Sequence, residues 1–316
     1  MSAVLNVVQA ETFKLLRKRR VYVLAGLWWV LLPVLALVVA RVLMTNLGAS
    51  FANEVGGIDA VVQTFASPYG LSLIGVAGPA NTSPNFFVVA IAAIAAVLVG
   101  EERSHHMWKT VLVAQPSRVA VMAGKLIVAM LALGALMAGA LASGVLFGAL
   151  GTTFLPTTFA GAWGTLATTY LLQWAFSVAL VAFAFLMIHL ARNLAVGVIL
   201  VFFLPGFLET LYTIYAAVVG FQPINRFNVF LQTIRLRQLL EDLPTYFFTA
   251  NVFAPARQPI RSLISDFTAA TGPGAAEFGN LLGANVSVER AGWVVLGYTA
   301  LCLALLAWRF LRADVD

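Results

Sequence analysis

Charged residues are scarce in this sequence, and their scarcity decides the class of protein. Only 10% of the 316 residues are charged and 61% are hydrophobic, whereas a soluble protein carries roughly 25% charged residues. The mean hydropathy is +0.93. A chain with so little polar surface cannot remain dissolved, so the sequence predicts an all-α, polytopic membrane protein.

Cysteine is nearly absent as well, because Cys302 is the single one in the sequence. One cysteine excludes an intramolecular disulfide and a cysteine-based metal cluster. Four metal-capable residues lie close together near residue 100, but the two histidines among them are adjacent and diverge by about 100° on a helix. We therefore expect no metal site, no catalytic residue and no cofactor in this chain. The four residues are Glu101, Glu102, His105 and His106.

A nucleotide-binding motif is also missing. The P-loop requires G-x-x-x-x-G-K-[ST], and the nearest match, Ala123-Gly124-Lys125, lacks the upstream glycine and the following Ser or Thr. Any dependence on ATP must therefore come from another polypeptide. The basic excess, 19 Lys and Arg against 13 Asp and Glu, does not indicate nucleic acid, because the charges flank apolar runs as membrane topology requires.

Apolar runs dominate what is present, and a membrane-spanning helix needs about 20 such residues. The charged start is not a signal peptide, since the apolar run after it is too long and no clear cleavage site follows. The predicted spans cover residues 21–43, 84–100, 126–150, 163–188, 194–219 and 291–308. The other predicted segments are an interfacial helix at 1–20, an external loop at 44–83, a polar loop at 101–125, a short turn at 151–161, an external insertion at 220–290 and a tail at 309–316.

Six spans place both termini on one side of the membrane, and the charges indicate which side. The segments on the terminal side hold 12 basic and five acidic residues, against seven basic and eight acidic ones on the other side. The positive-inside rule therefore predicts that both termini and the loop at 101–125 are cytoplasmic. We expect the protein to lie in a prokaryotic plasma membrane.

Small residues recur every four positions in the third predicted span, at Ala140, Gly144 and Gly148. Such spacing lets another helix approach closely. It predicts tight helix packing, either within the chain or across a dimer.

The N-terminal segment is weakly amphipathic when it is projected as a helix. Val4 and Val8 share one arc, and Lys14, Arg17 and Lys18 lie on the opposite one. Such a helix lies in the membrane interface with its basic face towards anionic head groups. The alternative is a disordered basic tail that only fixes the orientation of the chain.

Two charges lie near the outer ends of predicted spans. Glu209 follows Pro205 in the fifth span, and Arg41 lies late in the first. Because a charge in hydrocarbon is costly, Glu209 could line a hydrated translocation pathway or pair with Arg41. The alternative is that both side chains lie at the outer interface and reach water.

The loop between the second and third spans carries a family pattern, G-E-E-x(7)-T followed by Q-P-S-R and G-K. With the six-span topology, it resembles the membrane subunits of exporter-type ABC transporters, the type-2 ABC permease superfamily. The long insertion at 220–290 departs from many relatives, in which this region is short. The pattern residues are Gly100, Glu101, Glu102, Thr110, Gln115, Pro116, Ser117, Arg118, Gly124 and Lys125.

The resemblance implies two paired permeases, identical or related, each contacting a separate ATP-binding subunit. The loop would be a coupling helix in a groove of that ATPase, with Met107 and Trp108 as apolar anchors rimmed by charge. Lys14, Arg17 and Lys18 would belong to the connecting helix. The implied contact residues are Glu101, Glu102, His105, His106, Met107, Trp108 and Thr110.

We therefore expect the permease subunit of an ATP-driven exporter of an amphiphilic, lipid-like or drug-like cargo. A second hypothesis is a mechanotransmitter that acts on a partner outside the cytoplasm. An ion-coupled carrier would be expected to show repeated halves with polar residues at midplane, and an intramembrane enzyme would need clustered polar groups. The sequence shows neither feature convincingly, so both readings rank lower.

Overall fold

The computed structural model describes residues 2–46, 62–63, 65–77, 85–104, 117–191, 193–220, 242–271 and 286–312. Every regular element within these residues is a helix, which confirms the predicted all-α class for this part of the chain. In chain order the helices are α1 (Ser2–Leu16), α2 (Arg19–Gly26), a π-helical segment (Leu27–Leu31), α3 (Leu32–Asn46), α6 (Pro68–Ala77), α7 (Phe86–Ala95), a second π-helical segment (Ala96–Gly100), α8 (Glu101–Ser104), α10 (Arg118–Gly151), α11 (Trp163–Leu190), α12 (Leu194–Gly220), a 3-10 helix (Leu243–Tyr246), α15 (Phe248–Val252), α16 (Ala254–Thr271) and α18 (Val288–Arg312).

Five helices of the described chain are long and apolar enough to cross a membrane. The stretch Phe86–Gly100, in the predicted second span, is also apolar but falls short of that length. The structure therefore supports a membrane bundle, while the count of six spans stays a prediction. The five long helices are Arg19–Thr45, Arg118–Gly151, Trp163–Leu190, Leu194–Tyr212 and Val288–Phe310.

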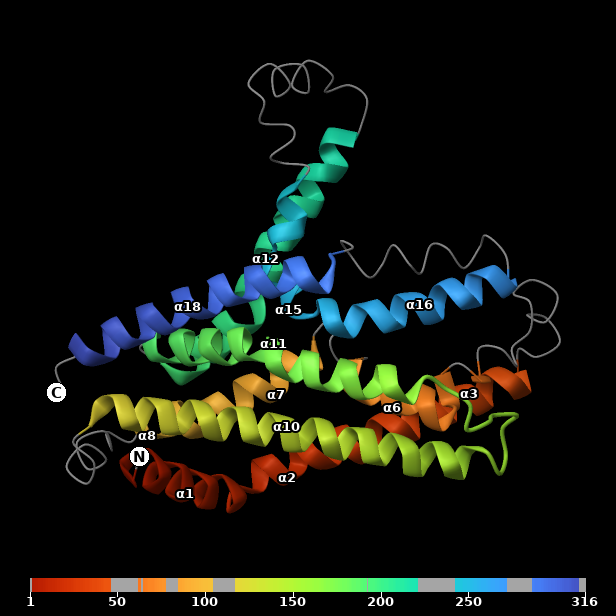
Figure 1. The fold of residues 1–316 in the computed structure, drawn as a ribbon, viewed down its shortest axis with the longest axis horizontal. Coiled ribbons are helices and arrows are strands. Elements are labelled where there is room, and N and C mark those ends of the chain that lie inside the picture. The colour runs from red at the N-terminus through yellow and green to blue at the C-terminus, as the bar shows by residue number, and fades with distance from the viewer. Residues whose placement is uncertain are drawn as a thin grey trace.

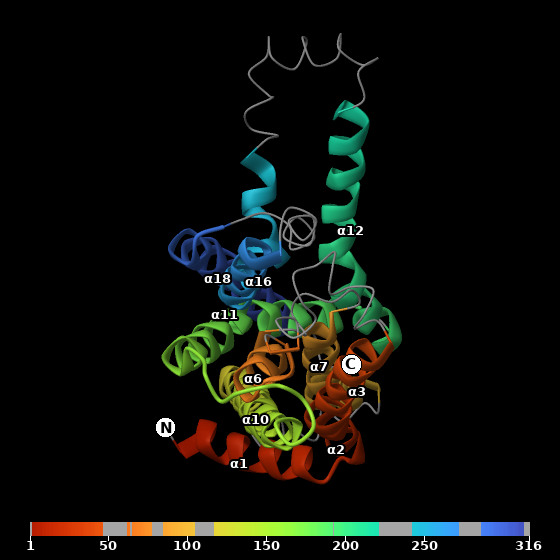
Figure 2. The same cartoon turned by 90° about the vertical axis from the view of Figure 1, so that its right-hand side faces the viewer.

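The long helices alternate in direction along one axis of the molecule. In Figure 1, α2, α3 and α10 run from the end marked N towards the opposite end, while α7, α11 and α18 return. As a result α1, α8, the start of α10 and the end of α18 all lie at one end, which we call the terminal end (Figure 1). Figures 1 and 2 both show the far end of α12, a helix that contains Pro205, extending out of the bundle, while α12 also contacts α11 and α7.

The helix α6 packs tightly along α10. A Cβ atom added to Gly144 would lie 2.5 Å from the Cα of Ser72, and one added to Gly148 would lie 2.6 Å from the nitrogen of Pro68. This confirms the close packing predicted from the small-residue spacing, and places it within the chain. The sequence prediction assigned residues 68–77 to an external loop, whereas the structure shows a buried helix, because uncharged and small residues can enter the bundle.

Aromatic side chains fill the centre of the bundle, where α7, α10 and α11 meet. Trp28, Phe87 and Phe185 have no exposed surface. The buried indole of Trp28 donates a hydrogen bond of 2.9 Å to the carbonyl oxygen of Gly75. This bond satisfies the one polar atom that the side chain brings into the core.

The outer faces of α12 and α18 are apolar and exposed. α12 is the least buried of the five long helices, and α11 is the most buried. Large hydrophobic side chains such as Phe203 and Phe207 of α12 and Trp293 of α18 are more than half exposed. Surfaces of this kind are expected to face lipid or another protein rather than water.

Part of the predicted external insertion, 220–290, packs against the bundle. Gln173 of α11, which is fully buried, donates to the carbonyl oxygen of Val252 and accepts from the backbone N–H of Ala256, both at 3.2 Å. These bonds hold α15 and α16 against α11, and Figure 1 shows α16 running beside it.

Candidate functional site

Four charged residues from distant parts of the sequence meet at the terminal end. They are Glu11 and Lys14 of α1, Glu102 of α8 and Lys125 of α10, and we call them the ion-pair cluster. The approach of α1 to α10 depends on Gly124, since a Cβ atom there would lie 2.6 Å from Cγ1 of Val7.

Lys125 is the centre of the ion-pair cluster and has no exposed surface. Its Nζ atom lies 2.5 Å from Oε1 of Glu11, 2.8 Å from Oε1 of Glu102 and 2.7 Å from the carbonyl oxygen of Leu98. An ammonium group has three N–H donors, so each can be matched to an acceptor. A buried charge is tolerated only when it is paired and hydrogen-bonded in this way.

Lys14 balances the second carboxylate. Its Nζ atom lies 2.7 Å from Oε1 of Glu102 and 3.4 Å from Oε2 of Glu11. Burial tends to raise the pKa of Glu102, but attraction and hydrogen bonds from Lys125 and Lys14 outweigh it. The pKa of Glu102 is therefore lowered below its ordinary value of 4.5, and the carboxylate is ionised at neutral pH.

A second set of ion pairs lies beside the ion-pair cluster. Glu101 accepts hydrogen bonds from Lys18 and from Arg20, the latter at 3.3 Å. Both basic side chains are more exposed than Lys125, so each pair contributes less to stability. Together the two sets connect both acidic residues of α8 to the N-terminal helices.

The ion-pair cluster joins three helices through matched charges. Each of the two carboxylates is bound by both lysines, so the charges of the cluster are matched. Among the residues that the structure describes, no group of three or more His, Cys, Asp or Glu side chains could hold a metal ion.

The structure describes only part of the predicted ATPase contact. Glu102 is 4% exposed, and its carboxylate faces α1 and α10 rather than an outer surface. Glu101 is half-buried and faces the basic residues of the N-terminal helices. The other predicted contact residues, His105, His106, Met107, Trp108 and Thr110, lie outside the described residues.

The predicted interfacial helix, 1–20, contains α1 and the start of α2, and its basic residues Lys14, Arg17 and Lys18 have protein partners. Lys14 and Lys18 bind the acidic residues of α8, while Arg17 lies over the ring of Phe13 at 4.0 Å. Leu5 and Phe13, in contrast, are more than half exposed. The face that the sequence directs towards head groups is therefore used, at Lys14 and Lys18, to hold α8.

The start of α10 is also tied to the last helix. The hydroxyl of Ser117 caps α10 by accepting from the backbone N–H of Ala120 at 3.3 Å. The guanidinium of Arg118 donates to the carbonyl oxygen of Phe310, near the end of α18, at 3.1 Å. Two residues of the family pattern thus fix the position at which α10 begins.

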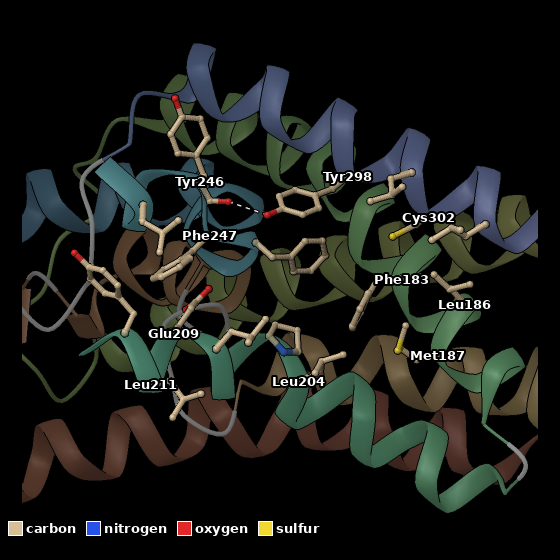
Figure 3. A pocket seen from close by; sticks show the side chains of 17 residues that line it. Phe183, Leu186, Met187, Leu204, Glu209, Leu211, Tyr246, Phe247, Tyr298 and Cys302 are labelled. Carbon is tan, nitrogen blue, oxygen red and sulfur yellow. Dashed lines mark hydrogen bonds between the residues drawn. The ribbon is translucent and has the colours of Figure 1, made fainter. Parts of the chain in front are cut away.

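Glu209 lines a cavity of about 730 Å³ between α11, α12, α18 and the segment Leu243–Phe248 (Figure 3). Its carboxylate accepts from both the backbone N–H of Thr249, at 3.1 Å, and the hydroxyl of that residue. Arg41 donates to the carbonyl oxygen of Phe154 at 3.2 Å rather than to Glu209. The structure therefore shows Glu209 at a cavity wall and Arg41 bonded to the backbone at Phe154, while a role of either residue in a translocation pathway stays a prediction.

Sequence reasoning missed the pairing of Lys125 with Glu11 and Glu102. The available signal was a lysine inside α10, whose first residues are otherwise apolar from Val119 onwards. Such a lysine needs a carboxylate partner, and Glu11 is the only acidic residue in the first 20. The signal indicates that a partner exists without saying which acidic residue it is.

Comparison with known proteins assigns the family. A family model described as "ABC-2 family transporter protein" matches residues 7–207, which include the whole ion-pair cluster and end within α12. A search among curated proteins found no match. Because the family match covers more than half of the sequence, the chain belongs to the ABC-2 family of transporter proteins, as the pattern in the loop after the second span predicted.

Proposed function

We propose that this permease is the membrane subunit of an exporter, driven by a separate ATPase that binds at the terminal end. The observation that carries the proposal is the ion-pair cluster, which joins α1, α8 and α10. α8 and the start of α10 belong to the predicted coupling loop, residues 101–125. Glu101 and Glu102 begin this loop and Lys125 ends it, and the segment 105–116 connects α8 to Ser117 in the sequence. A force applied to the segment would therefore act on helices that are tied together by charge.

The buried position of Glu102 gives it a specific part in this proposal. It positions α8 by binding Lys14 and Lys125, while the ATPase contact itself belongs to the segment that begins at His105. Movement of α8 would be transmitted to α1 through Lys14 and to α10 through Lys125. Buried ion pairs suit this role because they are directional and because separating them costs much free energy.

The terminal end is cytoplasmic in this proposal, because the ATPase needs cytoplasmic ATP and the basic residues are concentrated there. A second permease copy, or a related permease, would complete the transporter. The exposed apolar faces of the bundle leave room for both lipid and such a partner.

The test is a mild-detergent pull-down of the tagged full chain from its host, with ATPase activity measured on the eluate. We expect a P-loop ATPase to co-purify, and Trp108→Ala to reduce its recovery. The control is Arg312→Gln, which changes an exposed residue at the same end and should leave recovery unchanged. An eluate without an ATPase in the unmodified protein would contradict the proposal.

A further inference from the structure

The cavity beside Glu209 opens at the outer face of the bundle. Its floor is buried, as Leu186 of α11 and Cys302 of α18 are at most 5% exposed. Its rim is exposed, since Leu208 of α12 and Leu301 of α18 are each 56% exposed. The opening therefore lies between α12 and α18, the two long helices with the least buried surfaces.

One wall of the cavity is preformed by aromatic rings. The ring of Phe248 lies 5.3 Å from that of Phe183 and 5.2 Å from that of Tyr298. The hydroxyl of Tyr298 donates to the carbonyl oxygen of Tyr246 at 2.9 Å, the bond drawn in Figure 3. These contacts join α11, α15 and α18 around the cavity, so its shape does not depend on a ligand.

The lining of the cavity does not favour a charged ligand. Among the described residues that line it, Glu209 is the one charged residue, and both donors of Thr249 already bind its carboxylate. Arg257 of α16 also lies within electrostatic range of Glu209 and offsets its charge. The remaining lining side chains are apolar or aromatic, apart from a thiol.

We propose that this cavity binds one acyl chain of a membrane lipid, which enters between α12 and α18. A volume of about 730 Å³ is within the range of about 300–1,000 Å³ that ligand sites occupy. Since the bilayer is itself hydrocarbon, selective binding comes from packing against the fixed aromatic wall and not from leaving water. We take this lipid to be the cargo, a step that rests on the proposed function, whereas the binding itself can be measured on the permease alone.

The test uses the full-length permease in lipid nanodiscs, without an ATPase, and a phospholipid with a diazirine near the end of one acyl chain. After illumination, peptides that carry the lipid are identified by mass spectrometry. We expect saturable labelling of residues 183–187 and 301–305, lowered by unlabelled phospholipid. Labelling at Trp293 and Leu296, which point outwards and do not line the cavity, should not saturate.

A matched pair of variants tests the site. Leu305→Trp fills the cavity from α18 and should lower labelling there about fivefold or more, the factor that corresponds to about 1 kcal/mol of binding. Leu296→Trp adds the same side chain to the same helix outside the cavity, and labelling should persist. If Leu305→Trp fails to fold, the distribution of labels in the unmodified protein still shows whether the lipid binds in the cavity.

Three results would overturn the inference. The first is labelling spread evenly over all outward-facing residues. The second is labelling of the cavity that Leu305→Trp leaves unchanged. The third is competition by a water-soluble alkyl amphiphile but not by phospholipid, which would assign the cavity to a different ligand. Each result can arise whether or not an ATPase co-purifies, so a failure here is separate from a failure of the proposed function.

Discussion

Lys125 shows how one residue can specify the arrangement of three helices. A lysine with no exposed surface is unfavourable unless its charge and all its donors find partners. Glu11 and Glu102 supply the two negative charges, and the carbonyl of Leu98 supplies the third acceptor. A packing of α1 that moved Glu11 away would cost Lys125 one of its two carboxylate partners, so the lysine favours the arrangement that keeps all three acceptors.

Replacing Lys125 with Met should destabilise the fold strongly, by about 3 kcal/mol or more, because two buried carboxylates would lose their main partner. The measurement is the Tm of the purified protein in detergent. Lys18→Gln is the control, because its ion pair with Glu101 is more exposed and should contribute about 1 kcal/mol or less. Equal Tm values for the two variants would show that the ion-pair cluster does not hold the fold together.

The lowered pKa of Glu102 predicts how stability depends on pH. The folded state favours the ionised carboxylate more than the unfolded state does, so the stabilisation is fully present above the ordinary value of 4.5 and is lost as pH falls through the lowered pKa. We therefore expect the difference in Tm between the unmodified protein and Glu102→Gln to stay constant from about pH 8 to about pH 6. Below the ordinary value it should shrink; a difference that already shrinks near neutral pH would contradict the assignment.

At the scale of elements, the contact of α6 with α10 depends on missing side chains. The atoms facing Gly144 and Gly148 belong to the backbone of α6, which cannot rotate away as a side chain could. The two helices can keep this distance only while both positions lack a Cβ atom. This contact brings α6 into the bundle, although neither α6 nor the segment directly after it in the sequence carries a charged residue.

Gly148→Ala should therefore lower the Tm, because overpacking against backbone costs about 1–3 kcal/mol. Gly297→Ala is the matched control, since a Cβ atom at that position of α18 would meet nothing within 4 Å. In a helix interior this control should be neutral or stabilising by up to about 1 kcal/mol. If both variants melt alike, the α6–α10 contact is looser than the structure indicates.

The elements differ in how far the sequence could predict them. Long apolar runs predict helices because a membrane imposes length and composition locally, and the repeat at Gly144 and Gly148 predicts tight packing. The burial of α6 was not predicted, since its short uncharged sequence fits a loop equally well. The pairing of Lys125 with Glu11 joins residues 114 positions apart, and no local pattern encodes such a partner.

At the scale of the whole molecule, the ion pairs and the cavity lie on connected helices. The ion-pair cluster holds α1, α8 and α10, while Arg118 at the start of α10 binds Phe310 near the end of α18. α18 also forms one side of the cavity, through Cys302 and Leu305. A displacement at the terminal end can thus reach the cavity through a continuous series of packed helices.

This connection predicts that loosening α1 uncouples ATP hydrolysis from transport in the proposed complex. The double variant Lys14→Gln and Lys18→Gln removes both lysine links from α1 and its C-terminal end to α8, while Lys125 keeps its pairs with Glu11 and Glu102. Losing about 1 kcal/mol of coupling corresponds to about a fivefold change, so we expect the amount of lipid exported per ATP hydrolysed to fall by about that factor.

The measurement uses proteoliposomes that contain the permease and its ATPase. Arg17→Gln is the control, because the side chain of Arg17, which directly follows α1, lies over Phe13 of that helix, and this variant should keep the original ratio. A ratio that the double variant leaves intact would show that α1 does not transmit the motion.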